Sequence, residues 1–497
     1  MKHFLVRGML ALGLAFAPVA AAAQDRPVVT VGQTFIAAGL DPAEGSVGWA
    51  LTTHGVAEKL FTVARDGRVV PQLAFGAERT GERSWTVTLA EGRVFSDGAP
   101  VTAAAVADAL NRTGEANPAA RASAGRLSVT ATGPLSVAIA TERPTPVLPS
   151  VLAEWAMPIY RMTESGPVFT GPYAVAAFEP GARMRLIPNP HYPRAGERPE
   201  IDLIRIADAQ TLALGMMAGE FDLAFNLPAQ MLPMLASRKE ITVKSFPVEY
   251  QYMMWMNTRG GPLADPAVRQ AIDRAIDRAA LARAVRAGVP ATGAFAARFP
   301  FAAEAGTPHD PAAAAALLDA AGWTMGADGR RAKDGVPLAL TLWAYPQRPD
   351  LITFQPVIRA ALEALGIAVE TRVTEAATDT ARSGAFDLLL WAQHTAPAGD
   401  PAFFLSLFLG STGANNYSGW SDPAFDAILA QLSAEGDADR RIALAREAQA
   451  RVAEEAPVAF LLTPEWHVGL SARLADYEPW GSDYYIIRDD FALGLGR

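Results

Sequence analysis

The spacing of hydrophobic residues changes part way along the chain, and this change constrains the fold more than any single motif. Residues 84–89 alternate between apolar and polar, and residues 127–139 do the same on either side of Gly133-Pro134. Alternation is typical of half-buried strands, and the Gly-Pro pair predicts a hairpin turn. From residue 265 the apolar residues instead recur at helical spacing. We therefore expect a mixed α/β protein whose first part is rich in strands and whose second part is rich in helices.

Turn and capping residues locate several elements. Asp66-Gly67 predicts a hairpin, whereas residues 49–62 have the apolar spacing of a helix. Asp265-Pro266 and Asp310-Pro311 each predict a helix start, with the acid as N-cap and proline at the first helical position. The later expected elements are a helix over 356–365, a strand over 367–373 and a buried parallel strand over 386–391. Together they predict a second α/β lobe.

Composition excludes several classes of protein. A chain of 497 residues is too long for one compact core, so we expect two or three lobes. It has no cysteine, which excludes a disulfide scaffold, a thiolate metal site and a cysteine nucleophile. Lys and Arg number 43 against 52 Asp and Glu, a net charge of −9. This sign is wrong for a protein that binds nucleic acid by neutralising phosphates, so we expect no nucleic-acid partner.

The first 23 residues predict a cleaved signal peptide. Lys2 and Arg7 form a basic start, residues 8–19 are apolar, and residues 21–23 are three alanines that a signal peptidase accepts. The apolar run is shorter than the roughly 20 residues that span a bilayer. No cysteine follows the expected cleavage site, which excludes a lipid anchor. We expect a soluble protein in the periplasm of a Gram-negative bacterium.

Motifs of catalysis are absent from the sequence. It contains no Gly-x-Ser-x-Gly elbow, no Ser-x-x-Lys, no His-Glu-x-x-His and no phosphate-binding loop. Its six histidines are scattered, with no pair at metal-ligand spacing. We expect a binding protein and not an enzyme.

Several short segments, in order along the chain, carry a family resemblance. They are GLDPAEG (39–45), EKLF (58–61), WTVTLAEGRVFSDGAPVTAAAVADAL (85–110), TGPYAV (170–175), NPHY (189–192), MAGEFDLA (217–224), MNTRGGPLADPAVRQAIDRAIDR (256–278), AAGW (320–323) and NNYSGWSDPAFDAIL (415–429). In these segments the chain resembles the family 5 extracellular solute-binding proteins of ABC importers, the peptide/nickel group.

The resemblance implies a periplasmic-binding-protein-like fold of type II, cluster C, with two hinged lobes and an extra subdomain. Lobe one would hold a sheet domain made of residues 24–54, 165–251 and 464–497, with an inserted subdomain over 55–164. Lobe two would hold residues 252–463. A monomer of this kind would close over a small-molecule ligand and deliver it to an ABC permease complex in the inner membrane. It would need no cofactor; a metal chelate would enter as the ligand itself.

The resemblance leaves the ligand open, because family members differ in what they bind. Peptide binders carry an acid shortly after a strand-ending Trp, where it pairs with the peptide ammonium. Here Gln393-His394 follows Trp391 in that place, and Asp400 in the same loop is the alternative acid. Residues 391–401, 115–123 and 152–161 are instead similar to nickel and opine-metallophore binders. That similarity implies His394 as the metal-reaching residue and Arg161 as a clamp for the chelator's carboxylates.

Further binding residues are implied by their places at element ends that the family turns toward its cleft. The aromatic walls would be Trp49, Tyr252, Trp255, Trp391 and Tyr417, although large aromatic residues are equally suited to the core. Asn415 and Asn416 would donate hydrogen bonds to ligand carboxylates, or would form a turn. Our leading hypothesis is a receptor for a metal chelate, most simply of nickel. The alternatives are a receptor for di- or oligopeptides and a periplasmic chaperone or sensor partner without a transport role.

Overall fold

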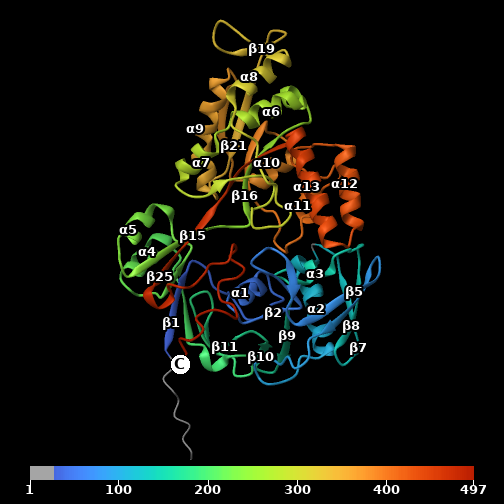
Figure 1. Ribbon diagram of the computed structural model, residues 1–497, viewed down its shortest axis with the longest axis vertical. Coiled ribbons are helices and arrows are strands. Elements are labelled where there is room, and N and C mark those ends of the chain that lie inside the picture. The colour runs from blue at the N-terminus through green and yellow to red at the C-terminus, as the bar shows by residue number, and fades with distance from the viewer. Residues whose placement is uncertain (1–26, 122, 497) are drawn as a thin grey trace, which may run out of the picture.

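The computed structural model describes residues 27–121 and 123–496, so the predicted signal peptide lies outside the described residues. The chain forms two lobes, which Figure 1 shows one above the other. We call the part built on residues 250–463 lobe two, and the remainder lobe one. Both the first described strand and the last one lie in lobe one, so the chain leaves this lobe and returns to it.

Lobe one contains a mixed seven-stranded sheet. Its first strand, β1, lies in the middle and pairs in parallel with β13 and β14, while β25 returns antiparallel to β14 and β15. Val29 and Val31 of β1 and Leu470 of β25 are fully buried. In sheet order the strands are β11 (Tyr173–Glu179), β12 (Arg183–Pro188), β13 (Glu200–Arg205), β1 (Val28–Gln33), β14 (Leu223–Phe225), β25 (Glu465–Ser471) and β15 (Ile241–Pro247). The helices α1 (Val47–Thr53), α4 (Ala209–Met217) and α5 (Leu232–Ala236) belong to this lobe.

The expected hairpins are confirmed in the strand-rich part of lobe one. Gly133-Pro134 joins the antiparallel strands β7 and β8, and the turn at Asp66-Gly67 joins β3 and β4. The four-stranded sheet is β5 (Ala74–Gly81), β6 (Ser84–Leu89), β8 (Ser136–Thr141) and β7 (Leu127–Gly133); the smaller sheets are β10 (Gly166–Phe169), β9 (Pro158–Thr163) and β2 (Glu58–Lys59), and β3 (Phe61–Val63) with β4 (Val69–Pro71). The helices here are α2 (Ala103–Ala116) and α3 (Leu148–Leu152).

Lobe two is a second α/β unit around a six-stranded sheet. In sheet order its strands are β17 (Val289–Pro290), β24 (Val458–Thr463), β16 (Tyr250–Met256), β23 (Leu388–His394), β21 (Ala339–Ala344) and β22 (Ala368–Val373). Its helices are α6 (Pro266–Ala275), α7 (Arg278–Val285), α8 (Pro311–Ala320), α9 (Pro349–Ala364), α10 (Ala377–Ser383), α11 (Ala402–Phe404), α12 (Pro423–Ala434) and α13 (Ala438–Glu455). A small sheet of β18 (Thr324–Met325), β19 (Arg331–Lys333) and β20 (Val336–Pro337) completes it.

Capping residues start helices where expected, but three element predictions need correction. The Asp265 carboxylate accepts a hydrogen bond from Ala267 N (2.9 Å), and Asp310 accepts one from Ala313 N (2.9 Å). The expected helix over 49–62 is only α1, since the chain turns at Gly55 and continues as strands β2 and β3. The helix α9 begins seven residues earlier than expected and contains Pro356. β23 is parallel to β21 but antiparallel to β16.

Two neighbouring crossovers connect the lobes. One runs from β15 to β16 and the other from β24 to β25, and Val248 N donates a hydrogen bond to Pro464 O (3.0 Å) between them. The lobes also touch at the β3–β4 turn, where a methyl group added to Gly67 would come within 2.6 Å of the Phe299 ring. Among the described residues, no helix is long and apolar enough to span a bilayer.

The division of the chain into domains stays a prediction. One of its boundaries, between residues 164 and 165, falls in the turn between β9 and β10, which are paired in one sheet.

Candidate functional site

A cavity of about 500 Å³ lies on lobe two beside the crossover into β16. It occupies the carboxyl ends of the parallel strands β21 and β23, where open α/β sheets commonly bind ligands. We call it the Trp391 cavity. Its lining residues are Tyr250, Tyr345, Gln347, Arg348, Glu375, Ala376, Ala377, Thr378, Asp379 and Trp391. The volume suits a small molecule.

Aromatic side chains form one wall of the Trp391 cavity. The Trp391 and Tyr345 rings, which both line the cavity, lie 5.6 Å apart between centroids, and the Tyr417 ring packs on Trp391 at 5.1 Å without lining the cavity. The Tyr345 hydroxyl accepts a hydrogen bond from Ala392 N (3.1 Å), which fixes it against β23. This wall offers a rigid apolar surface to a ligand.

Arg348 and Tyr250 line this cavity, and His394 packs on Tyr250 without lining the cavity itself. The Arg348 guanidinium donates a hydrogen bond to the Tyr250 hydroxyl (2.9 Å), and the His394 ring packs edge-on against Tyr250 at 4.2 Å. Burial, and after it the positive charge of Arg348, lowers the pKa of His394 to about 3. Its imidazole is therefore unprotonated at neutral pH. Nδ1 is buried and has no hydrogen-bond partner among the described residues.

The C-terminal segment adds residues that sequence reasoning missed. The Tyr484 ring stacks on His394 at 5.5 Å, so this lobe-one residue contacts lobe two. Burial raises the pKa of the neighbouring Asp483 to about 7, a shift that the charge of Arg348 opposes. Asp483 Oδ1 is buried and unpaired within the described part of the chain. The local sequence carries no signal for these roles, because only the return of the chain brings the segment to the site.

A second buried acid lies at the crossover itself. Glu249 is 2% exposed, and its carboxylate accepts a hydrogen bond from Ser482 Oγ (2.7 Å) and lies 3.4 Å from Arg298 Nη2 of lobe two. Burial raises the pKa of Glu249 to about 7. The crossover therefore contains a buried acid that is bonded to both the C-terminal segment and lobe two.

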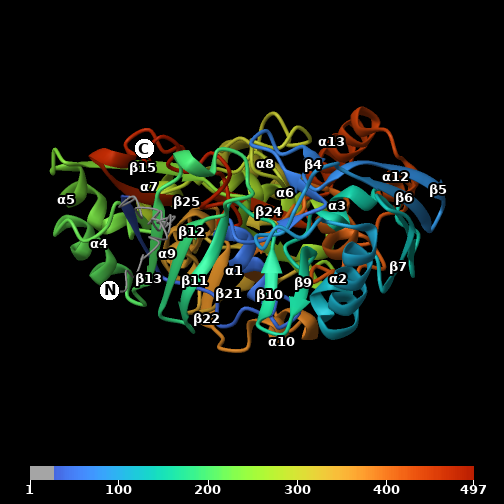
Figure 2. The ribbon, with the colours of Figure 1, turned by 90° about the horizontal axis from the view of Figure 1, so that it is seen from below.

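Two charged residues predicted for the site have other partners. Arg441 Nη2 donates to both carboxylate oxygens of Asp400 (2.8 Å each), a largely buried pair inside lobe two. Arg161 pairs with Asp97 and stands on β9. Figures 1 and 2 place β9 and β10 at the end of lobe one that faces away from lobe two. The structure brings neither residue to the Trp391 cavity.

The predicted aromatic residues fall into different surroundings. Trp391 lines the cavity, whereas Tyr252 lies behind it with its hydroxyl on Asp350 Oδ2 (3.0 Å). Trp255 is fully buried and stacks on Phe408 at 6.4 Å in the core of lobe two, with Tyr417 packed against it. Only one of these four residues therefore lines the cavity directly.

The remaining predicted residues also have local structural roles. Trp49 of α1 stacks on Phe35 at 4.4 Å, and its Nε1 has no partner within the described ranges. The Asn416 amide donates to Trp420 O (2.7 Å) and accepts from Gly419 N (3.0 Å), which is the turn alternative. Asn415 N bonds Leu407 O (3.0 Å) in the same turn. Across residues 27–121 and 123–496, no group of three or more His, Cys, Asp or Glu forms a metal site.

Two lobes, two crossovers and a solute-sized cavity beside them define a two-lobed solute-binding protein. The model of the bacterial extracellular solute-binding proteins, family 5, matches residues 68–416, and the chain belongs to this family. The family consists of solute-binding components of transporters and not of enzymes. The predicted family and fold class are thereby confirmed.

The known relatives include a glutathione-binding protein as well as proteins named for nickel or solved with a metal chelate. The chain is 27% identical to the glutathione-binding protein GsiB of Salmonella typhimurium, over 92% of this chain and 93% of the relative. A nickel ABC transporter structure from Bacillus halodurans matches with a TM-score of 0.84 and 26% identity, over 93% of this chain and 98% of that one. NikA from Brucella suis, in complex with Fe(III)-EDTA, matches with a TM-score of 0.79 and 25% identity, over 93% and 98%.

Proposed function

We propose that this protein is the periplasmic receptor of a peptide/nickel-type ABC importer and that it captures a small metal chelate, most simply of nickel. The two lobes close over the chelate, and the loaded monomer delivers it to a permease complex in the inner membrane. The ligand leaves chemically unchanged.

The observation that carries this proposal is that Arg348 and Trp391 line one cavity, with His394 packed against Tyr250 of the same lining. Metal ions coordinate an unprotonated imidazole, which is the form that His394 has at neutral pH. One imidazole supplies one coordinating nitrogen atom, so the chelator supplies the other atoms that coordinate the metal. Arg348 is suited to a chelator carboxylate, because a guanidinium binds carboxylates in a fixed planar geometry. Trp391 and Tyr345 cover the apolar flank of an amino-acid-derived chelator.

The relatives support a chelate as well as a free metal. One neighbour is named a nickel transporter, and another holds Fe(III)-EDTA, a metal enclosed by a ligand rich in carboxylates. Both span nearly the whole of this chain.

Thermal unfolding with Ni-EDTA tests the proposal. Ligand at about 100 times its Kd should stabilise the protein by about 2.7 kcal/mol, because it binds the folded form only. We expect the rise in Tm to be lost in His394→Ala and in Arg348→Ala.

Arg161→Ala is the matched control, since the sequence predicted this arginine as the clamp but its partner is Asp97, outside the Trp391 cavity. It should keep the full response. EDTA without nickel should give no rise. A response that survives in His394→Ala and Arg348→Ala, or that vanishes in Arg161→Ala alone, would contradict this assignment.

Asp483 favours a peptide receptor as the second candidate. A peptide ammonium needs a carboxylate partner when it is enclosed. Asp400 is already paired with Arg441, whereas Asp483 Oδ1 is unpaired among the described residues. If glutathione or dipeptides raise the Tm, Ni-EDTA does not, and Asp483→Asn removes the rise, the peptide function replaces the chelate function.

A further inference from the structure

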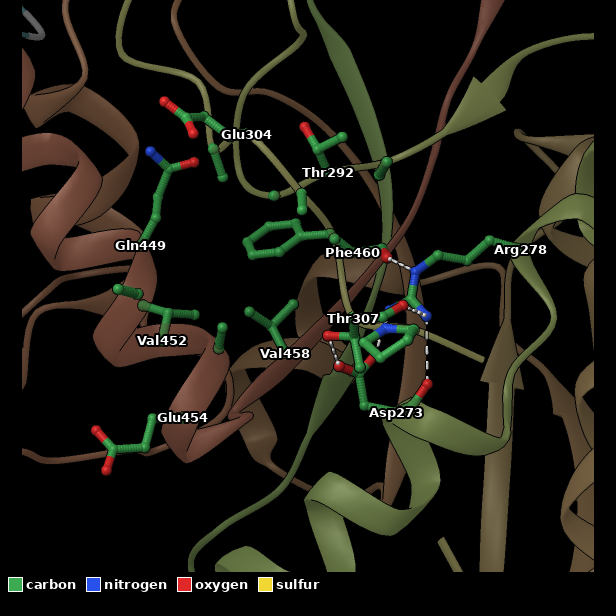
Figure 3. A pocket seen from close by; sticks show the side chains of 18 of the residues that line it. Asp273, Arg278, Thr292, Glu304, Thr307, Gln449, Val452, Glu454, Val458 and Phe460 are labelled. Atoms are coloured by element: carbon green, nitrogen blue, oxygen red, sulfur yellow. Dashed lines mark hydrogen bonds and ion pairs between the residues drawn. The ribbon is translucent and has the colours of Figure 1, made fainter. Parts of the chain in front are cut away.

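Lobe two contains a second cavity, of about 580 Å³, that shares no lining residue with the Trp391 cavity. It lies between α6, α13 and the irregular segment 291–310, and Val458 and Phe460 of β24 form its floor (Figure 3). We call it the Gln449 cavity. An irregular segment this long is uncommon in a compact lobe, and such loops often carry binding sites.

The Gln449 side chain has an unused acceptor at this cavity. The residue is 4% exposed, and its Nε2 donates to Phe301 O (2.7 Å) and Ala445 O (3.1 Å). These two carbonyls fix the orientation of the amide. Oε1 is therefore left buried, with no hydrogen-bond partner in the described part of the chain. A buried acceptor without a donor costs about 1–3 kcal/mol, so a ligand that supplies an N–H or O–H gains by binding here.

On the opposite side of the cavity, a buried ion pair is fully bonded within the protein. The Asp273 carboxylate pairs with Arg278 and accepts a hydrogen bond from Thr307 Oγ1 (2.5 Å), and Arg278 Nε donates to Phe460 O (2.7 Å), as Figure 3 shows. This buried pair needs no polar ligand group, whereas Gln449 Oε1 is a buried atom of the described lining residues that lacks a partner, so we take it as the polar anchor.

The acids around the cavity disfavour a cationic ligand. Each lining acid has an arginine partner: Asp273 with Arg278, Glu304 with Arg446, and Glu454 with Arg451. A cationic ligand would find no unpaired counter-ion among these acids, and enclosing it would be costly. Val452, Val458 and Phe460 offer an apolar surface to the rest of the molecule.

We propose that the Gln449 cavity is a second small-molecule site, which takes a compound without positive charge that has an apolar body and an N–H donor of the carboxamide class. The donor bonds Gln449 Oε1, and the apolar body packs on Val452, Val458 and Phe460. The site is separate from the proposed chelate site and does not depend on it.

Benzamide is the probe, and methyl benzoate, which has the same ring but no N–H, is its matched comparison. We expect benzamide to bind the full-length protein at least about tenfold more tightly than methyl benzoate, measured by titration of protein NMR signals. The shifted methyl signals should be those of Val452 and Val458.

Three variants decide the location. Gln449→Leu removes the acceptor and should abolish the preference for benzamide. Ala450→Phe, at an exposed lining position on α13, should block the cavity, whereas Ala443→Phe, exposed on the same helix but not among the lining residues, should leave binding unchanged. Equal binding of the two probes, or benzamide binding that survives Ala450→Phe, would overturn the proposal. The response to Ni-EDTA serves as the readout for the first site and should be the same in Ala450→Phe and wild type.

Discussion

At the scale of single residues, an acid that the sequence marks as a candidate is already paired, whereas an acid that no motif marks has an unpaired oxygen among the described residues. Asp400 lies in the loop where peptide binders place their acid, but two hydrogen bonds to Arg441 engage it. Asp483, which no motif marks, has an unpaired buried oxygen. A carboxylate that is already neutralised by a buried guanidinium has little left to offer a ligand, so tertiary partners and not sequence position decide which acid is free.

The raised pKa of Asp483 predicts a pH-dependent effect of Asp483→Asn. Burial raises this pKa from 3.8 to about 7, so the acid's contribution to stability is complete below pH 3.8 and is lost as pH rises through 7. Asparagine does not ionise. The variant should therefore gain stability relative to wild type between pH 3.8 and 7 and keep that gain at higher pH.

Urea unfolding of the ligand-free protein over this pH range measures the difference. Asp400→Asn is a control of opposite sign, because it leaves the buried Arg441 guanidinium without its counter-charge and should destabilise by about 3 kcal/mol. An Asp483→Asn curve parallel to that of wild type at every pH would refute the explanation.

At the scale of elements, a turn at a glycine ends a helix that the apolar pattern predicts to continue. The apolar spacing over 49–62 is helical, but α1 ends at Thr53 and Gly55 has φ +68°. At this turn the backbone also passes close to the C-terminal segment, since a methyl group on Gly55 would lie 2.9 Å from Ile487 O. A glycine is required for both reasons.

Gly55→Ala should therefore lower the free energy of unfolding by more than the strain of a left-handed alanine alone would do. Gly92 is the matched comparison, because its φ is +71° and nothing lies within 4 Å of the added methyl group. Gly92→Ala should destabilise by about 1 kcal/mol, and Gly55→Ala by clearly more, because Ile487 must move. The midpoints of urea unfolding compare them, and equal shifts would show that the close approach is unimportant.

At the scale of the whole molecule, contacts outside the crossovers join the lobes. The Gly399 loop of lobe two lies against the β3–β4 hairpin of lobe one, where a methyl group on Gly399 would lie 3.1 Å from Gly67 O. A larger side chain at this point would hold the lobes apart, and it would therefore weaken the binding of any ligand that both lobes enclose.

Gly399→Asn tests the coupling of this contact to binding. Asparagine tolerates the left-handed backbone, so the change adds bulk with little strain. We expect a larger radius of gyration by small-angle X-ray scattering with Ni-EDTA bound, and a Kd raised at least about tenfold. Gly92→Asn has the same φ of +71° but open surroundings, and it should change neither quantity. Unchanged affinity in Gly399→Asn would show that the contact is not part of closure.

The sequence by itself determined the fold class, the family, the hairpins at Gly67 and Gly133-Pro134, and the helix starts at Asp265 and Asp310. These features depend on local periodicity, turn residues and caps, which act over a few residues. Only the tertiary structure decided which side chains meet: it paired Asp400 with Arg441 and Arg161 with Asp97, and it brought Tyr484 onto His394. Burial and charge pairing arise between segments that are far apart in the chain, and local sequence does not encode their distances.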